Sequence, residues 1–304
     1  MTVEDPFATI HAARRPGRWL RFRADRICLG YLAVATGLLA VHAMLAELHW
    51  WLVPIHAAMA YGCGCIQHVQ AHTPMWTSRR LNVLTDLWIG LLRGDGPWSW
   101  IPTHVANHHR YANHPGDMTL TTRYSRGNNL LGWIAYTIDG TVRYVAAGCV
   151  ALAAGLRGPR RRWLPVIQVL AVTLMYLWAW NADAQRMVAL LMIPQGFGLL
   201  AMIATGYPQH HHADRESRWH HSRDFTGRVN NLLHFNHGFH SVHHIDPSLH
   251  WSEWPGAHRL AAHRWHPALQ EAHLPWYLLR TYFLAWAWPA WRSSPITTDP
   301  EPAS

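Results

Sequence analysis

Four long stretches of the chain carry no charged residue, and they form two pairs, each divided by a short polar break. The stretches cover residues 27–46, 50–67, 163–180 and 187–207. Each has about the length that an α-helix needs to cross the hydrocarbon core of a bilayer. The pattern therefore predicts an all-α integral membrane fold with four transmembrane helices in two hairpins.

The remaining apolar segments are shorter or interrupted by charge. Residues 81–92 are amphipathic, and residues 131–155 are apolar but contain two charged side chains, which favours an interfacial or partly buried helix. Residues 275–291 are rich in aromatic side chains and enclose one arginine, a pattern typical of a helix on the membrane surface. Residues 208–275 are polar and rich in histidine.

No linker or repeat divides the chain, so we expect a single membrane domain between two polar tails. The expected boundaries are a basic cytoplasmic N-terminal tail over 1–26, the membrane domain over 27–292 and a polar C-terminal tail over 293–304.

The distribution of arginine predicts the orientation in the membrane. The chain has 26 basic residues, all arginine, against 17 acidic ones, for a formal charge of +9. Arginines cluster over 14–26, 79–80 and 157–162, which lie on one side of the predicted hairpins, whereas the other side carries only Arg186. The positive-inside rule places both termini and the histidine-rich segment in the cytoplasm. Because orientation explains the arginine excess, we do not expect nucleic-acid binding, and the exclusive use of arginine favours a bacterial inner membrane.

The chain has 25 histidines, and in three segments they recur with regular helical spacing. Histidines three or four residues apart lie on one face of a helix and can bind one metal ion together. The segments, in chain order, are His68-Val-Gln-Ala-His72, His104-Val-Ala-Asn-His108-His109 and His240-Ser-Val-His243-His244. A fourth candidate follows the last predicted span, where the register of the ligand among His210, His211 and His212 stays open.

The composition of these clusters narrows the kind of metal site. Eight or nine histidines are too many for one ion, which indicates two, and imidazole suits zinc, copper, iron and nickel. Structural zinc would favour cysteine, yet none of the four cysteines belongs to a histidine cluster, and Cys63 and Cys65 lie inside a predicted span. A zinc metalloprotease motif would need glutamate after the first histidine, where this chain has Val69. With these zinc sites disfavoured, the pattern indicates an all-histidine site for two metal ions at a membrane face.

The order HxxxH, HxxxHH and HxxHH, divided by two hairpins, resembles the membrane-bound fatty acid desaturase superfamily. The segment 108–113, followed by Gly116-Asp117, is similar to the region after the second box in bacterial members, and 236–244 is similar to their third box. Gln209-His210 resembles an additional ligand motif. The resemblance implies a non-haem di-iron centre that uses O₂ as co-substrate. The ligands it implies are His68, His72, His104, His108, His109, His210, His240, His243 and His244.

A metal-bound imidazole needs an acceptor for its other ring nitrogen. Acidic residues near the boxes are candidates for this role, and an asparagine could hold a metal-bound water. These candidates are Asp117, Asp214, Asp246 and Asn236.

The resemblance implies an O₂-dependent fatty acyl desaturase, with the acyl chain carried by CoA, a carrier protein or a lipid, or supplied as the free acid. Hydroxylation, or oxidative decarboxylation to a terminal alkene, is an alternative at the same centre. A histidine-rich membrane metal transporter is a remote alternative, since the predicted spans contain no acidic residue to pass a cation. The chain has no electron-transfer motif, so a separate ferredoxin- or rubredoxin-type donor with its reductase is expected, together with membrane lipids.

Overall fold

The computed structural model describes residues 6–157 and 163–296, and most of these residues are helical. The chain divides into two compact units, each assembled from segments that are far apart in the sequence. Unit 1 contains Met1–Arg14, His108–Gly140 and Ala204–Ser304, and unit 2 contains Arg15–Asn107 and Thr141–Ile203. Because the two units interleave along the chain, neither corresponds to a continuous piece of sequence.

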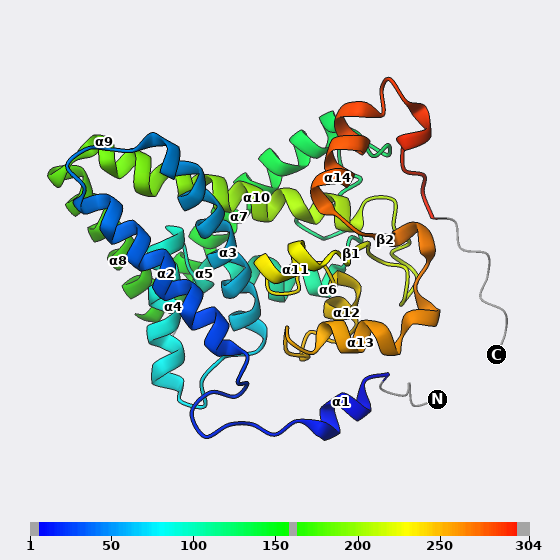
Figure 1. The fold of residues 1–304 in the computed structure, drawn as a ribbon, viewed down its shortest axis with the longest axis horizontal. Coiled ribbons are helices and arrows are strands. Elements are labelled where there is room, and N and C mark those ends of the chain that lie inside the picture. Colours follow the sequence, from blue (N-terminus) through cyan, green and yellow to red (C-terminus); the bar gives the residue numbers. More distant parts are fainter. Residues whose placement is uncertain (1–5, 158–162, 297–304) are drawn as a thin grey trace. The chain divides into compact units, whose positions relative to one another are not determined.

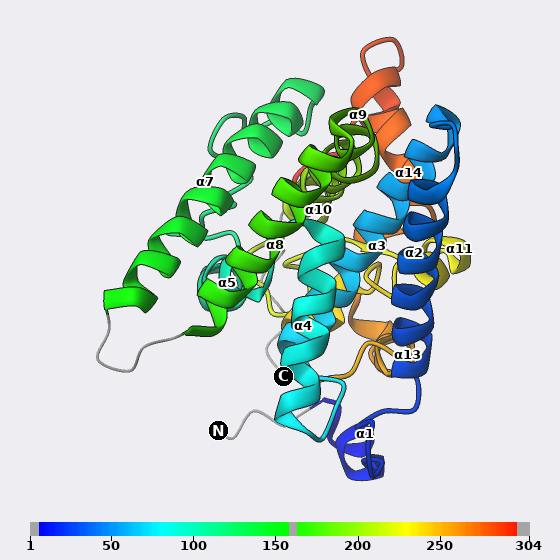
Figure 2. The same cartoon turned by 90° about the vertical axis from the view of Figure 1, so that its left-hand side faces the viewer.

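Unit 2 is a bundle of long helices, in which α3 packs against α2 and α4, and α4 packs against α8 (Figures 1 and 2). Short helices complete the bundle at the ends of the long ones. The elements are α2 (Asp25–Met44), η1 (Trp50–Leu52), α3 (Val53–His72), α4 (Arg79–Arg93), α5 (Pro97–Trp100), η2 (Ile101–His108), α8 (Trp163–Ala182), α9 (Ala184–Met187) and η3 (Val188–Met192).

Three helical segments of the described residues are long and apolar enough to cross a membrane, namely Asp25–Met44, Trp163–Ala182 and Ala184–His210. They correspond to the first, third and fourth predicted spans. The second predicted span, 50–67, covers η1 and most of helix α3, which is not among the three. Helix α3 contains polar residues that lower its mean hydropathy, and His56, Gln67 and Gln70 among them are buried. A count of four transmembrane helices therefore stays a prediction.

The turns of the two predicted hairpins meet through one arginine. The Arg186 guanidinium donates to the carbonyl oxygens of His42, at 3.2 Å, and Ala46, at 2.8 Å. These carbonyls lie at or just beyond the C-terminal end of α2, where helix carbonyls lack intrahelical donors and a positive charge is favoured by the helix dipole. The side chain that seemed exceptional on the charge-poor side of the sequence thus caps a helix.

Helix α4 has clear start and stop signals. The Ser78 hydroxyl accepts from the backbone N–H of Leu81 at 3.5 Å, and Gly94 ends the helix with φ +74°, a conformation that favours glycine. On the buried side of α4, the Asp86 carboxylate accepts a hydrogen bond of 3.2 Å from the Gln70 amide of α3. Burial raises the pKa of Asp86 to about 6, and the Gln70 hydrogen bond offsets only part of this effect.

Asp86→Asn is expected to stabilise the protein at pH 8 and to leave its stability nearly unchanged at pH 4. Asp86 titrates near pH 3.9 when unfolded and near pH 6 when folded, so its favourable contribution is lost as the pH rises through this window. The gain at pH 8 is expected to reach about 2 kcal/mol. Thermal unfolding of both proteins at the two pH values measures it, and an equal difference at pH 4 and pH 8 would contradict the prediction.

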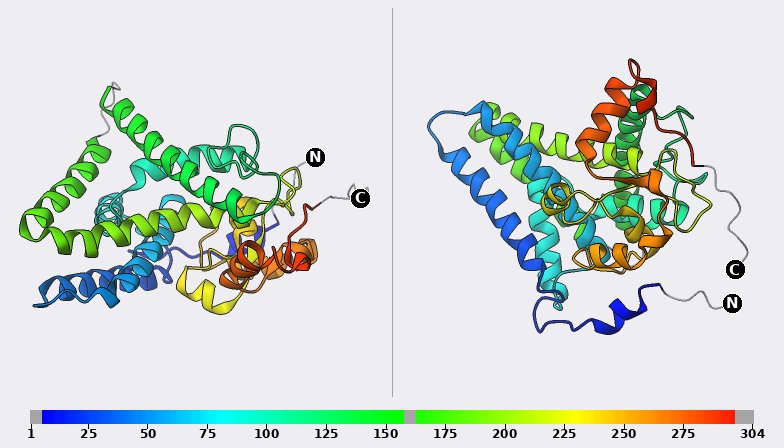
Figure 3. Two further views of the ribbon diagram at one scale, coloured as in Figure 1. Left: turned by 90° about the horizontal axis from the view of Figure 1, so that it is seen from above. Right: turned by 45° about the vertical axis from the view of Figure 1, so that its right-hand side comes forward.

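Unit 1 consists of short helices around a two-stranded parallel sheet, in which Asp224 pairs with Gln270 and Phe225 with Glu271 (Figure 3). Helices α7 (Leu130–Arg157) and α10 (Ile193–His210) continue from one unit into the other. The other elements are α1 (Ala8–Ala13), α6 (His109–Tyr111), β1 (Asp224–Phe225), α11 (Arg228–Leu233), α12 (His240–Ile245), α13 (Trp254–Leu260), η4 (Ala262–Arg264), η5 (Pro267–Leu269), β2 (Gln270–Glu271), α14 (Leu274–Leu278), η6 (Leu279–Leu284) and η7 (Pro289–Trp291).

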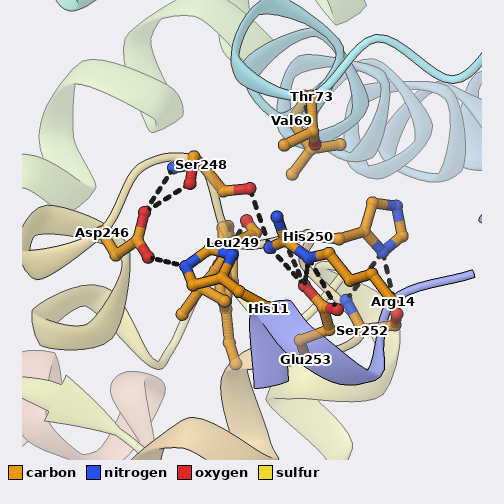
Figure 4. Close-up of polar contacts among 11 residues, drawn as sticks. His11, Arg14, Val69, Thr73, Asp246, Ser248, Leu249, His250, Ser252 and Glu253 are labelled. Atoms are coloured by element: carbon orange, nitrogen blue, oxygen red, sulfur yellow. Dashed lines mark hydrogen bonds and ion pairs between the residues drawn. The ribbon is translucent and has the colours of Figure 1, made fainter. Parts of the chain in front are cut away.

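The N-terminal segment is more ordered than the expected basic tail. Phe7 is fully buried, and the Arg14 guanidinium binds the Glu253 carboxylate, with N–O distances of 2.8 to 3.2 Å. His11 Nε2 lies 2.6 Å from Asp246 Oδ2, two residues after the last histidine of the third cluster (Figure 4). The segment before the first span thus fastens the loop that follows α12. The expected C-terminal tail lies mostly outside the described residues.

Candidate metal centre

Four histidines from three separate segments converge in unit 1. His108 ends η2, His210 ends α10, and His240 and His244 lie one turn apart on α12. One ring nitrogen of each lies within 4.8 Å of those of the other three. His210 Nε2 is 3.1 Å from His108 Nε2 and 2.8 Å from His240 Nε2. The C-terminal ends of η2 and α10 and both turns of α12 therefore direct their imidazoles to one point.

The environment of this cluster favours neutral imidazole. Burial, followed by the neighbouring histidines, holds the pKa values of His240 and His244 well below their usual range. A neutral imidazole keeps a lone pair for a metal ion. The buried His244 Nε2 has no hydrogen-bond partner among the described residues.

Asp117 holds one of the four rings. Its carboxylate lies 2.8 Å from His108 Nδ1, and it accepts from the backbone N–H groups of Asn113, at 2.7 Å, and Thr119, at 2.8 Å. Burial alone would raise the pKa of Asp117, but His108 and the two N–H groups outweigh it, so the pKa is lowered. A charged Asp117 fixes the His108 ring with Nε2 directed into the cluster, which is the arrangement common in metal sites.

Two further predicted ligands of unit 1 lie beside this cluster and contact each other. The rings of His109 and His243 are 4.6 Å apart and nearly perpendicular. His243 also packs against Trp254, with 5.1 Å between ring centres, and is almost fully buried. In the HxxxHH and HxxHH patterns, adjacent histidines thus point in different directions, as the 100° rotation per helical residue requires.

The remaining three predicted ligands lie together in unit 2. His68 and His72 come from the last turn and a half of α3, and His104 from η2, which has π-helical geometry. The ring centres of His104 lie 4.3 Å from His68 and 5.4 Å from His72, and those of His68 and His72 are 5.2 Å apart. Their closest nitrogen atoms all lie within 4.8 Å of one another. π-Helical turns occur often at functional sites, where they redirect a side chain.

Trp100 forms one wall of the unit 2 cluster. Its ring stacks on His104 at 4.6 Å and lies 5.5 Å from His68. On the other side, the guanidinium of the buried Arg93 lies 5.9 Å from the Trp100 ring centre. Arg93 is hydrogen-bonded to Gln67 and paired with Asp95 at 3.3 Å, so an inner polar network adjoins the wall.

The structure separates the three consecutive histidines at the end of α10. Only His210 belongs to the cluster, whereas His211 Nε2 and His212 Nε2 both lie within hydrogen-bond distance of the Arg126 carbonyl oxygen, at 3.2 and 3.1 Å. His211 also stacks on Tyr207 at 4.5 Å. The sequence left this register open because all three positions follow the same apolar helix.

The other candidates for supporting roles have different contacts. Asp214 accepts from the backbone N–H of Glu216, Asp246 interacts with His11 and Ser248, and the Asn236 amide donates to the Trp251 carbonyl at 3.0 Å. A fourth acidic residue, Asp224, accepts from the backbone N–H of Ser241 at 2.8 Å and thereby anchors α12. Of the four residues proposed from sequence, Asp117 is the one brought to a predicted ligand by these contacts.

His221 is a residue that the sequence patterns missed. It is only 8% exposed, and its ring centre lies 5.5 Å from that of His244. Burial lowers its pKa to about 4, despite the opposing effect of Asp224. His221 follows His220 directly in a loop and has no histidine three or four residues away that belongs to a box. No sequence signal therefore distinguished it from a surface histidine.

Comparison with known proteins agrees with this arrangement. The family described as fatty acid desaturase matches residues 48–276, a range that contains all three histidine boxes and His210. A search of the curated proteins found no match. Since the matched region covers most of the 304 residues, the chain belongs to the fatty acid desaturase family.

Proposed function

We propose that the protein is an O₂-dependent fatty acyl desaturase with a histidine-ligated di-iron centre. The observation that carries the proposal is the convergence of the imidazoles of His108, His210, His240 and His244, three of which are buried. The chain's membership of the fatty acid desaturase family supports an oxidoreductase with an acyl substrate. Buried side chains of this kind serve packing poorly, because each buries a polar nitrogen that needs a partner.

The geometry fits a metal ion of the kind that imidazole prefers. With metal–nitrogen bonds of about 2.1 Å, two nitrogens on one ion lie about 3 to 4 Å apart. The observed Nε2 separations of 2.8 and 3.1 Å are close to this range, and His244 Nε2 would gain the partner that the described residues do not provide. We assign one iron to these four histidines.

We assign the second iron to the cluster of His68, His72 and His104. This assignment rests on the close approach of the three rings, whose centres lie 4.3 to 5.4 Å apart. When bound, iron supplies the redox chemistry that uses O₂ to remove hydrogen from an unactivated C–H bond. The protein's own groups orient the imidazoles, and Asp117 keeps the His108 ring in its ligating orientation.

A cavity in unit 2 supports an acyl substrate. It has a volume of about 560 Å³, and its lining is mainly apolar, with Leu177, Trp180 and Leu199 among its walls. Its polar end contains Arg93 and Asp95, and Arg93 contacts Trp100, which stacks on His104. An apolar chain in this cavity would lie one aromatic ring away from the histidines of unit 2.

We further propose that a separate ferredoxin- or rubredoxin-type protein, reduced by its own reductase, supplies the two electrons each turnover needs. The surplus of arginine on the predicted cytoplasmic side would attract an acidic donor. The same charge distribution supports an inner-membrane location with both termini and the histidine boxes in the cytoplasm.

Product analysis tests the proposed reaction. The protein is expressed, with a matched electron donor, in a host that lacks the activity, and its lipids and headspace gases are analysed. A new internal double bond is expected. A hydroxy acid would indicate hydroxylation instead of desaturation. A volatile terminal alkene one carbon shorter than the acid would indicate oxidative decarboxylation. Absence of product, together with zinc instead of iron in the purified protein, would refute the oxygenase function.

A further inference from the structure

We infer that His221 is a fifth imidazole ligand of the metal ion in unit 1. The inference rests on the proposed metal centre and adds to it a residue outside all the histidine boxes. It requires that the His221 ring rotate toward the four clustered histidines when the ion binds, since its ring centre now lies 5.5 Å from that of His244.

The backbone directly after His221 is tied to segments that carry ligands. The N–H of Arg223 donates to the carbonyl of Gln209 at 2.6 Å, next to His210. The Ser241 hydroxyl donates to the Ser222 carbonyl at 3.1 Å, and Ser241 follows His240 directly. The two residues after His221 are therefore fixed to the ends of α10 and α12, so that rotation of the side chain brings the imidazole toward the cluster or away from it.

His221 already takes part in the geometry of the cluster. Its carbonyl oxygen lies 3.3 Å from His210 Nδ1, which leaves His210 Nε2 directed at His108 and His240. An imidazole whose other nitrogen is held by a backbone carbonyl is a common form of metal ligand. His221 thus orients the His210 ring through its backbone carbonyl and places its own imidazole next to the cluster.

The side chain itself lacks the partner that a buried imidazole needs. His221 is more than nine-tenths buried, and its Nδ1 has no hydrogen-bond partner among the described residues. His244 Nε2, across a ring separation of 5.5 Å, has none either. One cation bound beside the four-histidine cluster would give both nitrogens the partner that the described side chains do not provide.

The adjacent His220 provides a matched comparison. Its Nε2 lies 3.1 Å from the Arg264 carbonyl, and its ring packs against His266, with 5.5 Å between ring centres. The two histidines are adjacent in the same loop, yet of the two only His221 packs against a member of the four-histidine cluster, His244. Replacing each by alanine therefore separates metal ligation from general effects on the loop.

The test is a titration of the purified, metal-free full-length protein with Co²⁺ in detergent, since the visible spectrum of Co²⁺ reports its coordination. The wild type is expected to bind two ions per chain. His221→Ala is expected to weaken one of the two sites about 10- to 100-fold and to alter its spectrum, whereas His220→Ala should match the wild type. Thermal unfolding of the metal-free variants checks that the loop substitutions leave the fold intact.

Two results would overturn the inference in distinguishable ways. Two wild-type sites with unchanged affinity and spectrum in His221→Ala would refute the ligand role alone and leave the proposed function standing. A wild-type protein that binds neither Co²⁺ nor Fe²⁺ would refute the metal centre itself. If the alanine variant unfolds, His221→Gln, which fills the space without an imidazole, is subjected to the same titration with the same expectations.

Discussion

His244→Ala is expected to abolish turnover and to lower bound iron from two ions per chain to about one. The substitution removes one imidazole from the four-histidine cluster, where ligand nitrogens lie within 4.8 Å of one another. Burial holds the pKa values of His210 and His240 well below their usual range, and water would have to replace the missing nitrogen beside three buried histidines. Metal analysis of the purified variant and product formation with a matched donor measure the two effects.

A matched control for this variant is His263→Ala. His263 is an exposed histidine in unit 1, outside the four-histidine cluster. The control should retain both iron ions and full activity, which separates loss of a ligand from the loss of any histidine. Full activity with two bound irons in His244→Ala would rule out the ligand set assigned to unit 1.

His104→Ala is expected to abolish turnover as well, but through loss of the other iron. His104 is the member of the unit 2 cluster that comes from η2, and its ring contacts those of His68, at 4.3 Å, and Trp100, at 4.6 Å. Without it, the histidines of α3 are left as a pair one turn apart, which binds an ion much more weakly than three converging ligands. Iron content should again fall to about one ion per chain.

The double variant distinguishes two independent sites from one shared site. If the clusters bind separate ions, His104→Ala combined with His244→Ala should retain almost no iron. If each single variant already loses both ions, the ions bind cooperatively, and the assignment of one iron to each cluster would need revision. Trp88→Ala, at a residue that hydrogen-bonds to Thr36 away from both clusters, is the control and should keep its iron.

Much of the site could be predicted because helical spacing is a local property. His68 and His72, or His240 and His244, share a helix face whatever the rest of the chain does, since each residue rotates the helix by about 100°. The same holds for apolar length, which indicated the helices now seen at Asp25–Met44, Trp163–Ala182 and Ala184–His210. These features need no knowledge of the tertiary contacts.

Other expectations depended on contacts that no local pattern contains. The register among His210, His211 and His212 follows from the direction in which α10 ends, and the structure turns the latter two toward Arg126. Asp117 and Asp246 are both acidic residues near a box, yet only Asp117 folds back onto a predicted ligand, because Asn113 and Thr119 form a turn around its carboxylate.

Residue type and short-range spacing were sufficient to predict the apolar helices, the histidines that share a face and the family resemblance. Tertiary contacts were needed to show which histidines from distant segments meet, that α3 packs polar side chains inside the protein, and that His221 lies beside His244. The reason is physical: burial and long-range packing bring together nitrogens that are up to 136 residues apart in the chain, as His108 and His244 are, and no periodicity records those encounters.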